Sequence, residues 1–333
     1  MLLVDTGGIE PYSTDVILSQ MRRQAQLAID SAEVIILVTD IRSGVVATDS
    51  EVAAMLQKSG KPIVLCVNKC DTPGELPADF YEFYNLGLGD PIPVSSVHGM
   101  GTGDLLDEVL KYLPDTVGFQ EVDPVWLATL NAGLRDQYSF VGEGRNGGAS
   151  GEYNPIFYKK EVFDLIDSGT RWLSDTPNKV SKVEESSLNR IYTFALLERK
   201  SDGKRIMVIN THFDHTSAQA REKQAEVLVD YLKTVTDYPI VLTGDFNVTD
   251  QSEAYNTIVS NEFVLLDAHK VAEKTTGASY TFHGFDKVDM EKRSKIDFVF
   301  VTPDIKVLQS EVTKEVKDAL LSDHNPQWTD LEF

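Results

Sequence analysis

Five short polar groups in the second part of the chain carry residue types that can perform phosphoester chemistry. Each follows or begins a short apolar stretch, and the ends of strands are where loops present reactive side chains. The groups are Gln120-Glu121, Asn210 to His215, Gly244 to Asn247, Ile296-Asp297 and Ser322 to Pro326. A single Asp or Asn at a strand end often makes only an Asx turn. Five such groups in one chain indicate a composite site instead.

The residue types in these groups match what hydrolysis of a phosphoester requires. The reaction needs charge stabilisation on the non-bridging oxygens, an in-line water and help for the leaving group. A histidine with a carboxylate partner supplies a general base or acid near neutral pH. Asp245 and Asn247 are two residues apart, so on an extended segment they can point to the same side. Glu121 is a natural Mg²⁺ ligand, and one or two such ions would neutralise the phosphate.

The first third of the chain carries three short motifs of another kind. Asp5-Thr6-Gly7-Gly8 follows an apolar run, and such an Asp can hold Mg²⁺ through water while the last Gly N–H meets a γ-phosphate. Asn68-Lys69-Cys70-Asp71 follows a second apolar run, where a carboxylate can recognise guanine by accepting two N–H bonds. Ser95-Ser96 follows a third. Their order, each at the end of an expected strand, indicates guanine-nucleotide recognition.

The elements that must position these groups follow two patterns. Residues 1–113 alternate continuous apolar strands with helices, which predicts a parallel α/β sheet. The strands expected there are Leu2–Val4, Val34–Val38, Ile63–Val67 and Ile92–Val94, and the helices are about Thr14–Asp30, Asp49–Lys58 and Leu105–Tyr112. Beyond Pro114 the expected strands are Thr116–Phe119, Pro155–Tyr158, Arg190–Leu197, Arg205–Ile209, Ile240–Leu242 and Phe298–Val301, with one strong helix at Ala218–Val235. This second pattern predicts a largely antiparallel two-sheet sandwich.

The net charge of −21 opposes one class of function. Residues 1–114 hold seven Lys and Arg against sixteen Asp and Glu, and the remainder is acidic as well. A non-specific binder of duplex DNA needs a basic footprint. We therefore expect a phosphorylated small molecule or a short nucleic acid as the substrate. The sequence has no apolar run of 18 residues and no basic region before its first apolar residues, so we expect no membrane span, no export signal and a cytoplasmic location.

Residues 1–113 resemble the first G domain of the Der family of ribosome-assembly GTPases. The resemblance is carried by VDTGGIEP, KSGKP, VNKCD and FYEFYNLGLGDPIPVSSVHGMGTGDLL. It implies a P-loop-GTPase-like parallel sheet, switch residues at Asp5 and Gly8, and ribosome association; the guanine-nucleotide-binding residues it implies are Asn68, Lys69, Asp71 and Ser95. The printed sequence contains no G-x-x-x-x-G-K-[ST] phosphate loop, so the sheet is expected to be truncated. We expect GTP or GDP to bind at most weakly, without hydrolysis of GTP.

Residues 114–333 resemble the endonuclease/exonuclease/phosphatase superfamily. The motifs are VGFQEV, GEYNPIFY, RWLSDTP, NTHFDH, TGDFN, TFHGF, KIDFVFV and SDHNP. The resemblance implies a DNase-like four-layer α/β sandwich with Mg²⁺ or Mn²⁺ as its cofactor. The residue roles that it implies are metal binding by Glu121 and Asp323, phosphate contact by His212 with Glu152 as its carboxylate neighbour, water orientation and phosphate binding by Asp245 and Asn247, and an acid–base dyad of Asp297 and His324. Arg145, His283 and Asp214 are lesser candidates for substrate contact, and Trp172 is expected to be a packing residue.

The chain departs from this second family at one place. The family's opening strand, which carries an Asn ligand, and the helix after it have no counterpart before Thr116. We hypothesise that the helix Leu105–Tyr112 replaces the lost helix. Three functions remain open: a Mg²⁺-dependent phosphoester hydrolase, a module that binds guanine nucleotide or ribosomal RNA, and a fusion of two truncated genes with little activity. Nucleic acids, phospholipids and sugar phosphates all remain possible substrates.

Overall fold

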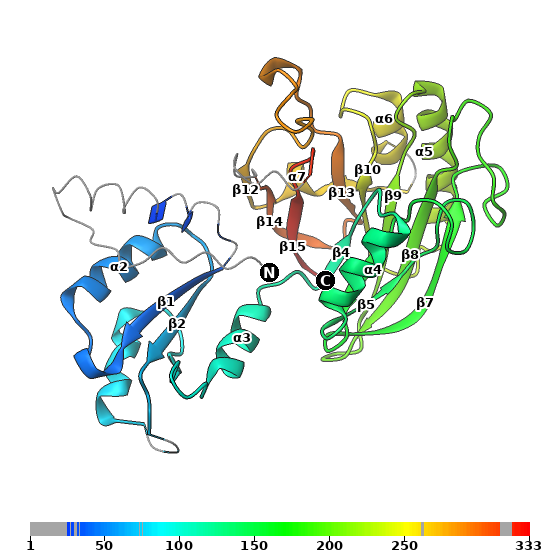
Figure 1. Ribbon diagram of the computed structural model, residues 1–333. Helices are drawn as coiled ribbons and strands as arrows, with labels where there is room; N and C mark the ends of the chain where they lie inside the picture. Colours follow the sequence, from blue (N-terminus) through cyan, green and yellow to red (C-terminus); the bar gives the residue numbers. More distant parts are fainter. Residues whose placement is uncertain are drawn as a thin grey trace. The chain divides into compact units, whose positions relative to one another are not determined.

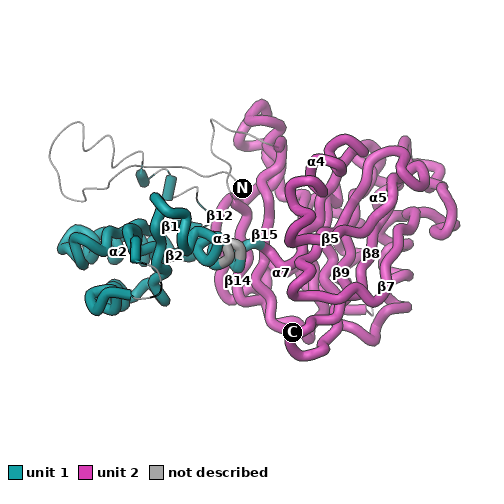
Figure 2. The backbone as a smooth tube through the Cα atoms, turned by 60° about the horizontal axis from the view of Figure 1, so that its bottom comes forward, with its two compact units in different colours: residues 1–113 teal, residues 114–333 magenta. Residues whose placement is uncertain are grey.

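The computed structural model describes residues 25–26, 28–29, 32, 34–72, 74, 76–260, 263–313 and 322–333. The predicted strand Leu2–Val4, the motif Asp5 to Gly8 and most of the predicted helix Thr14–Asp30 lie outside the described residues. The chain divides into two compact units, unit 1 from Met1 to Leu113 and unit 2 from Pro114 to Phe333 (Figure 2). Each unit is described by itself below.

Unit 1 contains a parallel sheet in the order β1-β2-β3, which confirms the predicted parallel arrangement. Its elements are β1 (Ile35–Asp40), η1 (Ile41–Ser43), α2 (Ala47–Gln57), β2 (Ile63–Asn68), η2 (Ala78–Leu86), β3 (Ile92–Pro93) and α3 (Thr102–Leu110). Successive residues of β2 face opposite sides, as the pleat of a strand requires. Leu65 and Val67 pack with Phe80 and Phe83 of η2, whereas Val64 and Cys66 pack on the other side. Helices therefore cover both faces of the sheet.

The predicted helix Leu105–Tyr112 is found as α3, two to three residues nearer the N-terminus. Its Leu105 and Val109 pack in one cluster with Val64 and Cys66 of β2. The helix is thus committed to the core of unit 1. Our hypothesis that it replaces a lost helix of the second family was wrong, because its apolar face is already buried against its own sheet.

Unit 2 is built on a six-stranded sheet in the order β11-β13-β10-β9-β8-β7 (Figure 1). The strands are β7 (Phe163–Trp172), β8 (Ile191–Arg199), β9 (Arg205–His212), β10 (Ile240–Asp245), β11 (Leu266–Asp267) and β13 (Asp297–Val301). Only β9 and β10 run parallel, because α5 (Ala218–Leu232) returns the chain between them, and the other pairs are antiparallel. Leu228 of α5 and Tyr255 of α6 (Glu253–Val259) belong to the core on one face of this sheet.

The opposite face of the six-stranded sheet is covered by two separate three-stranded sheets. One has the order β4-β6-β5 and the other β12-β14-β15. Their strands are β4 (Thr116–Gly118), β5 (Tyr138–Val141), β6 (Ile156–Lys159), β12 (Lys274–Gly277), β14 (Lys306–Val312) and β15 (Gln327–Glu332). A second core lies between the layers, where Val208 and Val299 of the large sheet meet Ile156 and Val307. β4 and β15 are each the terminal strand of their sheet.

Short helices complete unit 2: α4 (Pro124–Leu134) lies beside β5, α7 (Ala268–Val271) contacts β13 and β14, and η3 (Met290–Lys292) lies in the loop before β13. The result is the predicted α/β sandwich of the DNase-like type. The close approach of its layers is visible at Gly118, where an added Cβ would lie 2.7 Å from side-chain atoms of Asn210 in β9 and Thr243 in β10. Only glycine fits there, and this contact places the end of β4 directly over the carboxyl ends of β9 and β10.

Candidate active centre of unit 2

Three strand ends bring their polar residues into one row across the six-stranded sheet. His212 ends β9, Asp245 ends β10 and Asp297 begins β13. In the sheet register Asp245 is directly opposite His212 on one side and Asp297 on the other. The parallel pairing of β9 and β10 and the antiparallel pairing of β10 and β13 both follow from the topology, so the row is a direct product of the fold.

The end of β4 is tied to this row by Asn210, which is fully buried. Its amide nitrogen donates to the carbonyl oxygen of Phe119 at 2.7 Å, and its amide oxygen accepts from Gln120 Nε2 at 2.7 Å. The next residue, Glu121, has φ of 56°, a left-handed conformation that is uncommon outside glycine. Its carboxylate is 69% exposed and comes within 4.0 Å of His212 Nε2. Strained backbone of this kind is concentrated at functional sites.

Asp297 and His324 form a hydrogen-bonded pair. The Asp297 Oδ2 to His324 Nδ1 distance is 2.8 Å, and His324 Nε2 lies 4.0 Å from Asp245 Oδ2. Burial acts to lower the pKa of His324, but the hydrogen bond and charge of Asp297, with the charges of Asp245 and Asp323, raise it to about 9. The imidazole is therefore protonated at neutral pH. Its Nδ1 is held by Asp297, and Nε2 is left to face the row.

Asp245 and Asn247 form a compact turn after β10. The backbone N–H of Asn247 donates to Asp245 Oδ1 at 2.8 Å, and its amide nitrogen donates to the carbonyl of Phe213 at 3.2 Å. Asn247 also has a left-handed φ of 51°. Burial, and after it the negative charge of Asp297, raise the pKa of Asp245 to about 8. Carboxylates are thus crowded here, and the nearby His324 imidazolium compensates their repulsion only in part.

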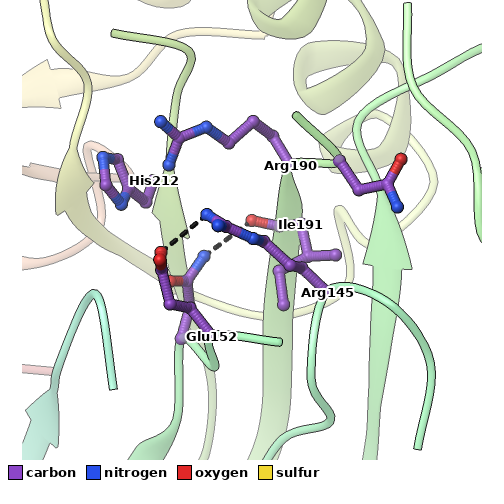
Figure 3. A pocket seen from close by; sticks show the side chains of 7 residues that line it. Arg145, Glu152, Arg190, Ile191 and His212 are labelled. Atoms are coloured by element: carbon purple, nitrogen blue, oxygen red, sulfur yellow. Dashed lines mark hydrogen bonds and ion pairs between the residues drawn. The ribbon is translucent and has the colours of Figure 1, made fainter. Parts of the chain in front are cut away.

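His212 is buried between acidic and basic side chains. Its Nε2 lies 3.5 Å from Asp245 Oδ2. Burial, reinforced by the positive charge of Arg190, holds the pKa of His212 well below its ordinary value, so the ring is neutral. Glu152 lies in the same cluster and accepts from Arg145 NH1 at 2.6 Å. Figure 3 shows His212, Glu152, Arg145 and Arg190 turned toward a common space.

The structure brings together most of the residues that were expected to form this site. Two groups have ligand atoms that lie within 4.8 Å of one another, Glu121 with Glu152 and His212, and Asp245 with Asp297 and His324. Asn247 adjoins the second group. Asp323 belongs to neither group among the described residues; its backbone carbonyl accepts from the N–H groups of His283 and Gly284 at 3.0 and 3.1 Å.

Among the lesser candidates for substrate contact, Asp214 is held in place by hydrogen bonds from neighbouring residues. Its side chain is buried, and it accepts hydrogen bonds from Ser186, Ser187, Thr216 and Ser217, which hold its pKa well below the ordinary value although burial opposes them. Asp214 therefore organises the turn before α5 and is not free to contact a substrate. Trp172 is buried and donates to the Arg145 carbonyl at 2.7 Å, which fits its expected packing role.

Sequence reasoning missed two cations in the centre. Arg190 precedes β8 and lines the space beside His212. Lys295 donates from Nζ to the Asp297 carbonyl at 3.0 Å and lies 3.7 Å from the centre of the Phe298 ring; burial lowers its pKa to about 8. The only sequence signal for either residue was its position next to a predicted strand, which many surface cations share.

The chemistry of the donor set fits a divalent cation. Glu121 has an exposed carboxylate, and the buried Asp245 is electrostatically repelled by both Asp297 and Glu121. Mg²⁺ is bound through one or two carboxylates and keeps several waters. An ion held by Glu121 near Asp245 would relieve the repulsion that the crowded carboxylates create.

The base-recognition corner of unit 1, defined as Asn68, Lys69, Asp71 and Ser95, also assembles. Asn68 Oδ1 accepts from the backbone N–H groups of Lys69 and Ser96 at 2.8 and 3.1 Å. Asp71 accepts from Ser95 Oγ at 2.6 Å and from Arg42 at 2.7 Å. The hydrogen bond from the Ser95 hydroxyl holds the pKa of Asp71 below its ordinary value; burial opposes this, and the hydrogen bond from the Arg42 guanidinium adds to it. Lys69 forms an ion pair with Asp40.

The sandwich and its centre define the class, and the chain belongs to the endonuclease/exonuclease/phosphatase family. The family model matches residues 84–324. An endonuclease/exonuclease/phosphatase from Bacteroides vulgatus is 44% identical, with 69% of this chain and 88% of that chain covered and a TM-score of 0.65. A mannosyl-6-phosphatase from Bacteroides thetaiotaomicron is 31% identical, with 72% and 94% covered and a TM-score of 0.62. These similarities indicate a hydrolase that acts on phosphoester bonds.

Unit 1 has different relatives. The model of the elongation factor Tu GTP binding domain matches residues 1–115. The GTPase Der of Acetivibrio thermocellus is 59% identical over 113 residues, which cover 34% of this chain and 26% of that protein. The GTPase Der of Ruminiclostridium cellulolyticum is 58% identical over 291 residues, a match longer than unit 1 that covers 87% of this chain and 60% of that protein. The chain thus spans less than two thirds of the length of this relative. Within the part of the chain that the structure describes, no helix has both the length and the apolar character needed to cross a membrane.

Proposed function

We propose that the centre of unit 2 hydrolyses phosphoester bonds with the help of Mg²⁺ or Mn²⁺. The proposal rests on one observation. His212, Asp245 and Asp297 are paired in register at one end of their strands, and Asp297 is hydrogen-bonded to His324. A hydrolytic site needs a proton donor, a proton acceptor and a phosphate-binding group around one point. Here the two imidazole Nε2 atoms lie 3.5 and 4.0 Å from the same Asp245 oxygen.

In this proposal Glu121 holds the metal ion, with Asp245 as the nearest further carboxylate. The bound ion would polarise the phosphoryl group and neutralise its charge. Because no role for the Asp323 carboxylate is visible in either cluster, we propose Asp323 as a source of negative charge next to His324. The remaining side chains move protons and orient the substrate.

His324 is proposed as the general acid. Its raised pKa keeps Nε2 protonated at neutral pH, and its bond to Asp297 fixes the tautomer and stabilises the imidazolium. Asp245 is proposed as the proton acceptor for the attacking water. Burial and the charge of Asp297 raise its pKa to about 8, and a bound cation would lower this pKa so that the carboxylate is ionised at neutral pH. Asn247 donates toward the phosphate, and neutral His212 donates a hydrogen bond from Nε2.

A panel of substrates with metal control tests the proposal. Purified chain is incubated with p-nitrophenyl phosphate, bis-p-nitrophenyl phosphate and short single-stranded DNA in the presence of Mg²⁺, Mn²⁺ or excess EDTA. We expect hydrolysis of at least one substrate that EDTA abolishes and added metal restores. The same rate in EDTA would contradict the role of the metal, and the absence of any hydrolysis would contradict the function.

For unit 1 we propose guanine-nucleotide binding that is at most weak. Arg42 occupies one oxygen of Asp71, the carboxylate that would recognise the base, and Asp40 holds the Lys69 ammonium. A nucleotide must displace these contacts before it gains its own. Titration calorimetry with GTP and Mg²⁺ tests this, since submicromolar affinity would contradict it.

A further inference from the structure

The space beside His212 contains a buried positive charge that has no ion-pair partner. Arg190 is 4% exposed, and within the described residues no carboxylate oxygen lies within 4.0 Å of its guanidinium nitrogens. Its NH2 contacts His215 Nδ1 at 3.0 Å, whereas its Nε is buried without a hydrogen-bond partner. An unpaired buried charge is costly, so native structures normally pair such groups.

The negative charges of Asp214, Glu152 and Asp245 act on Arg190 from a distance, but none of these carboxylates forms an ion pair with it. Asp214 has hydrogen-bond donors on both of its oxygens. Glu152 is bound to Arg145 at 2.6 Å. Arg145 and Arg190 therefore bring two positive charges to one space, and only Glu152 among the residues lining it carries a negative one.

The space opens at the active centre and has room for one small group. It is lined by Arg145, Glu152, Asn154, Asn189, Arg190, Ile191 and His212. Figure 3 shows the Arg190 guanidinium extended toward the His212 ring and the Arg145 guanidinium directed to Glu152. The space that a water-sized atom can occupy measures about 10 Å³. A single water needs roughly 10–15 Å³ on this measure, so the space admits one anionic oxygen of a phosphoryl group and no nucleobase.

We propose that the Arg145–Arg190 pocket binds the second negative charge of a phosphomonoester, so that the centre selects dianionic monoesters over monoanionic diesters. This preference is a substrate specificity only if the centre hydrolyses phosphoesters as proposed above. A metal ion held by Glu121 compensates one charge of the phosphoryl group, and Arg190 with Arg145 compensates the other. A diester has an ester group in place of the second anionic oxygen, which leaves the Arg190 charge unpaired.

Binding of inorganic phosphate tests the pocket without requiring turnover. Calorimetric titrations in saturating Mg²⁺ compare phosphate, a dianion near pH 8, with diethyl phosphate, a monoanion. We expect phosphate to bind more tightly, and we expect Arg190→Met to weaken phosphate binding roughly 10- to 100-fold, the range for a hydrogen bond to a charged group. Diethyl phosphate binding should change little. Arg205→Met is the matched control, because Arg205 begins the strand that His212 ends and is paired with Glu198.

Thermal melting separates this role from a structural one. Removing an unpaired buried charge should leave the melting temperature of Arg190→Met unchanged or higher, whereas a structural arginine would lower it. If Arg190→Met fails to fold, Arg145→Gln, which changes a less buried residue, must show the same selective loss of phosphate affinity. Equal losses for phosphate and diethyl phosphate, or no loss for phosphate, would overturn the proposal. Selective phosphate binding in a protein that hydrolyses no ester would refute the proposed function and leave this inference standing.

Discussion

The base-recognition corner of unit 1 and the active centre of unit 2 differ in how completely their charged side chains are paired. In unit 1, Asp71 is bound to Arg42 and Lys69 to Asp40, so each charge of the corner is paired within the chain. In unit 2, Asp245 and Asp297 crowd each other, and Arg190 has no carboxylate within reach among the described residues. An unpaired buried charge lowers the free energy of unfolding, so stability alone does not favour keeping one. Its persistence in unit 2 agrees with the proposed binding of a metal ion and an anion there.

Backbone strain, in contrast, marks both regions. The described non-glycine residues with left-handed φ are Lys69, Glu121, Asn247, Phe285 and Asp286. Three of these were singled out from the sequence as site residues. The strain in unit 1 lies at Lys69, in the turn that the sequence predicts to bind guanine nucleotide, and the charges of this turn are paired within the chain. Only in unit 2 do strain and unbalanced charge occur together.

The largest effect is expected at the acid–base pair. His324→Ala should lower kcat by roughly 10²–10⁴-fold, the range for a positioned acid–base group. Asp297→Asn should follow it, because the bond that fixes the imidazole and stabilises its charge is weakened. Steady-state kinetics with saturating Mg²⁺ measures both. His269→Ala serves as a control on another histidine of unit 2, and a comparable loss there would show that the effect is not specific.

Glu121→Gln should act on the metal and not on proton transfer. Replacement of residues that merely support a ligand typically costs about 10–100-fold in metal affinity, so loss of a carboxylate ligand should cost at least as much. The apparent Mg²⁺ affinity, obtained from rates at increasing Mg²⁺, should fall while the rate at saturation recovers in large part. Unchanged Mg²⁺ dependence would remove Glu121 from the metal site.

The unbalanced charges also predict how stability depends on pH. The folded-state pKa values of His324, about 9, and Asp245, about 8, lie above their ordinary values of 6.5 and 3.8. Between pH 6.5 and 8 the folded protein therefore binds more protons than the unfolded chain, and stability falls as pH rises. Above pH 8 the lowered pKa of Lys295 acts in the opposite direction. In EDTA the melting temperature should drop from pH 6.5 to 8, and Mg²⁺ should reduce the drop. A melting temperature that rises from pH 6.5 to 8 would contradict the assigned charges.

The smallest effect is expected in unit 1. Arg42→Ala frees one oxygen of Asp71, yet the ion pair is at the surface, where such pairs contribute little. Guanine-nucleotide affinity should rise by less than tenfold and remain weak, as measured by calorimetry with GDP. A change to tight binding would show that Arg42 alone suppresses an otherwise complete site.

The sequence predicted those parts of the centre that local patterns specify. Strands β9, β10 and β13 are short apolar runs with polar residues at the ends that face the site, so His212, Asp245 and Asp297 could be found without coordinates. Sequence reasoning did not find α4, whose residues are apolar on nearly all sides and so show no helical period, or β7, whose middle is exposed. Tertiary packing determines which faces of α4 and β7 are buried, and the spacing of apolar residues along the sequence does not reveal it.

Arg190 shows why the rest could not be predicted. In sequence it is an arginine beside a strand, indistinguishable from Arg205, which is exposed and paired. Its importance comes from a missing partner, and a missing partner is visible only when Asp214 and Glu152 are placed and their own hydrogen bonds are known. For the same reason Asp214 was misassigned as a substrate contact, since its donors come from two separate loops.

One measurement compares the two regions most directly. Mg²⁺-dependent hydrolysis of p-nitrophenyl phosphate is followed for the parent chain, His324→Ala in the active centre and Asp71→Ala in the base-recognition corner. The account predicts a parent rate for Asp71→Ala and a rate at least roughly a hundredfold lower for His324→Ala. Hydrolysis by His324→Ala at the parent rate would show that the activity does not arise at the centre described for unit 2.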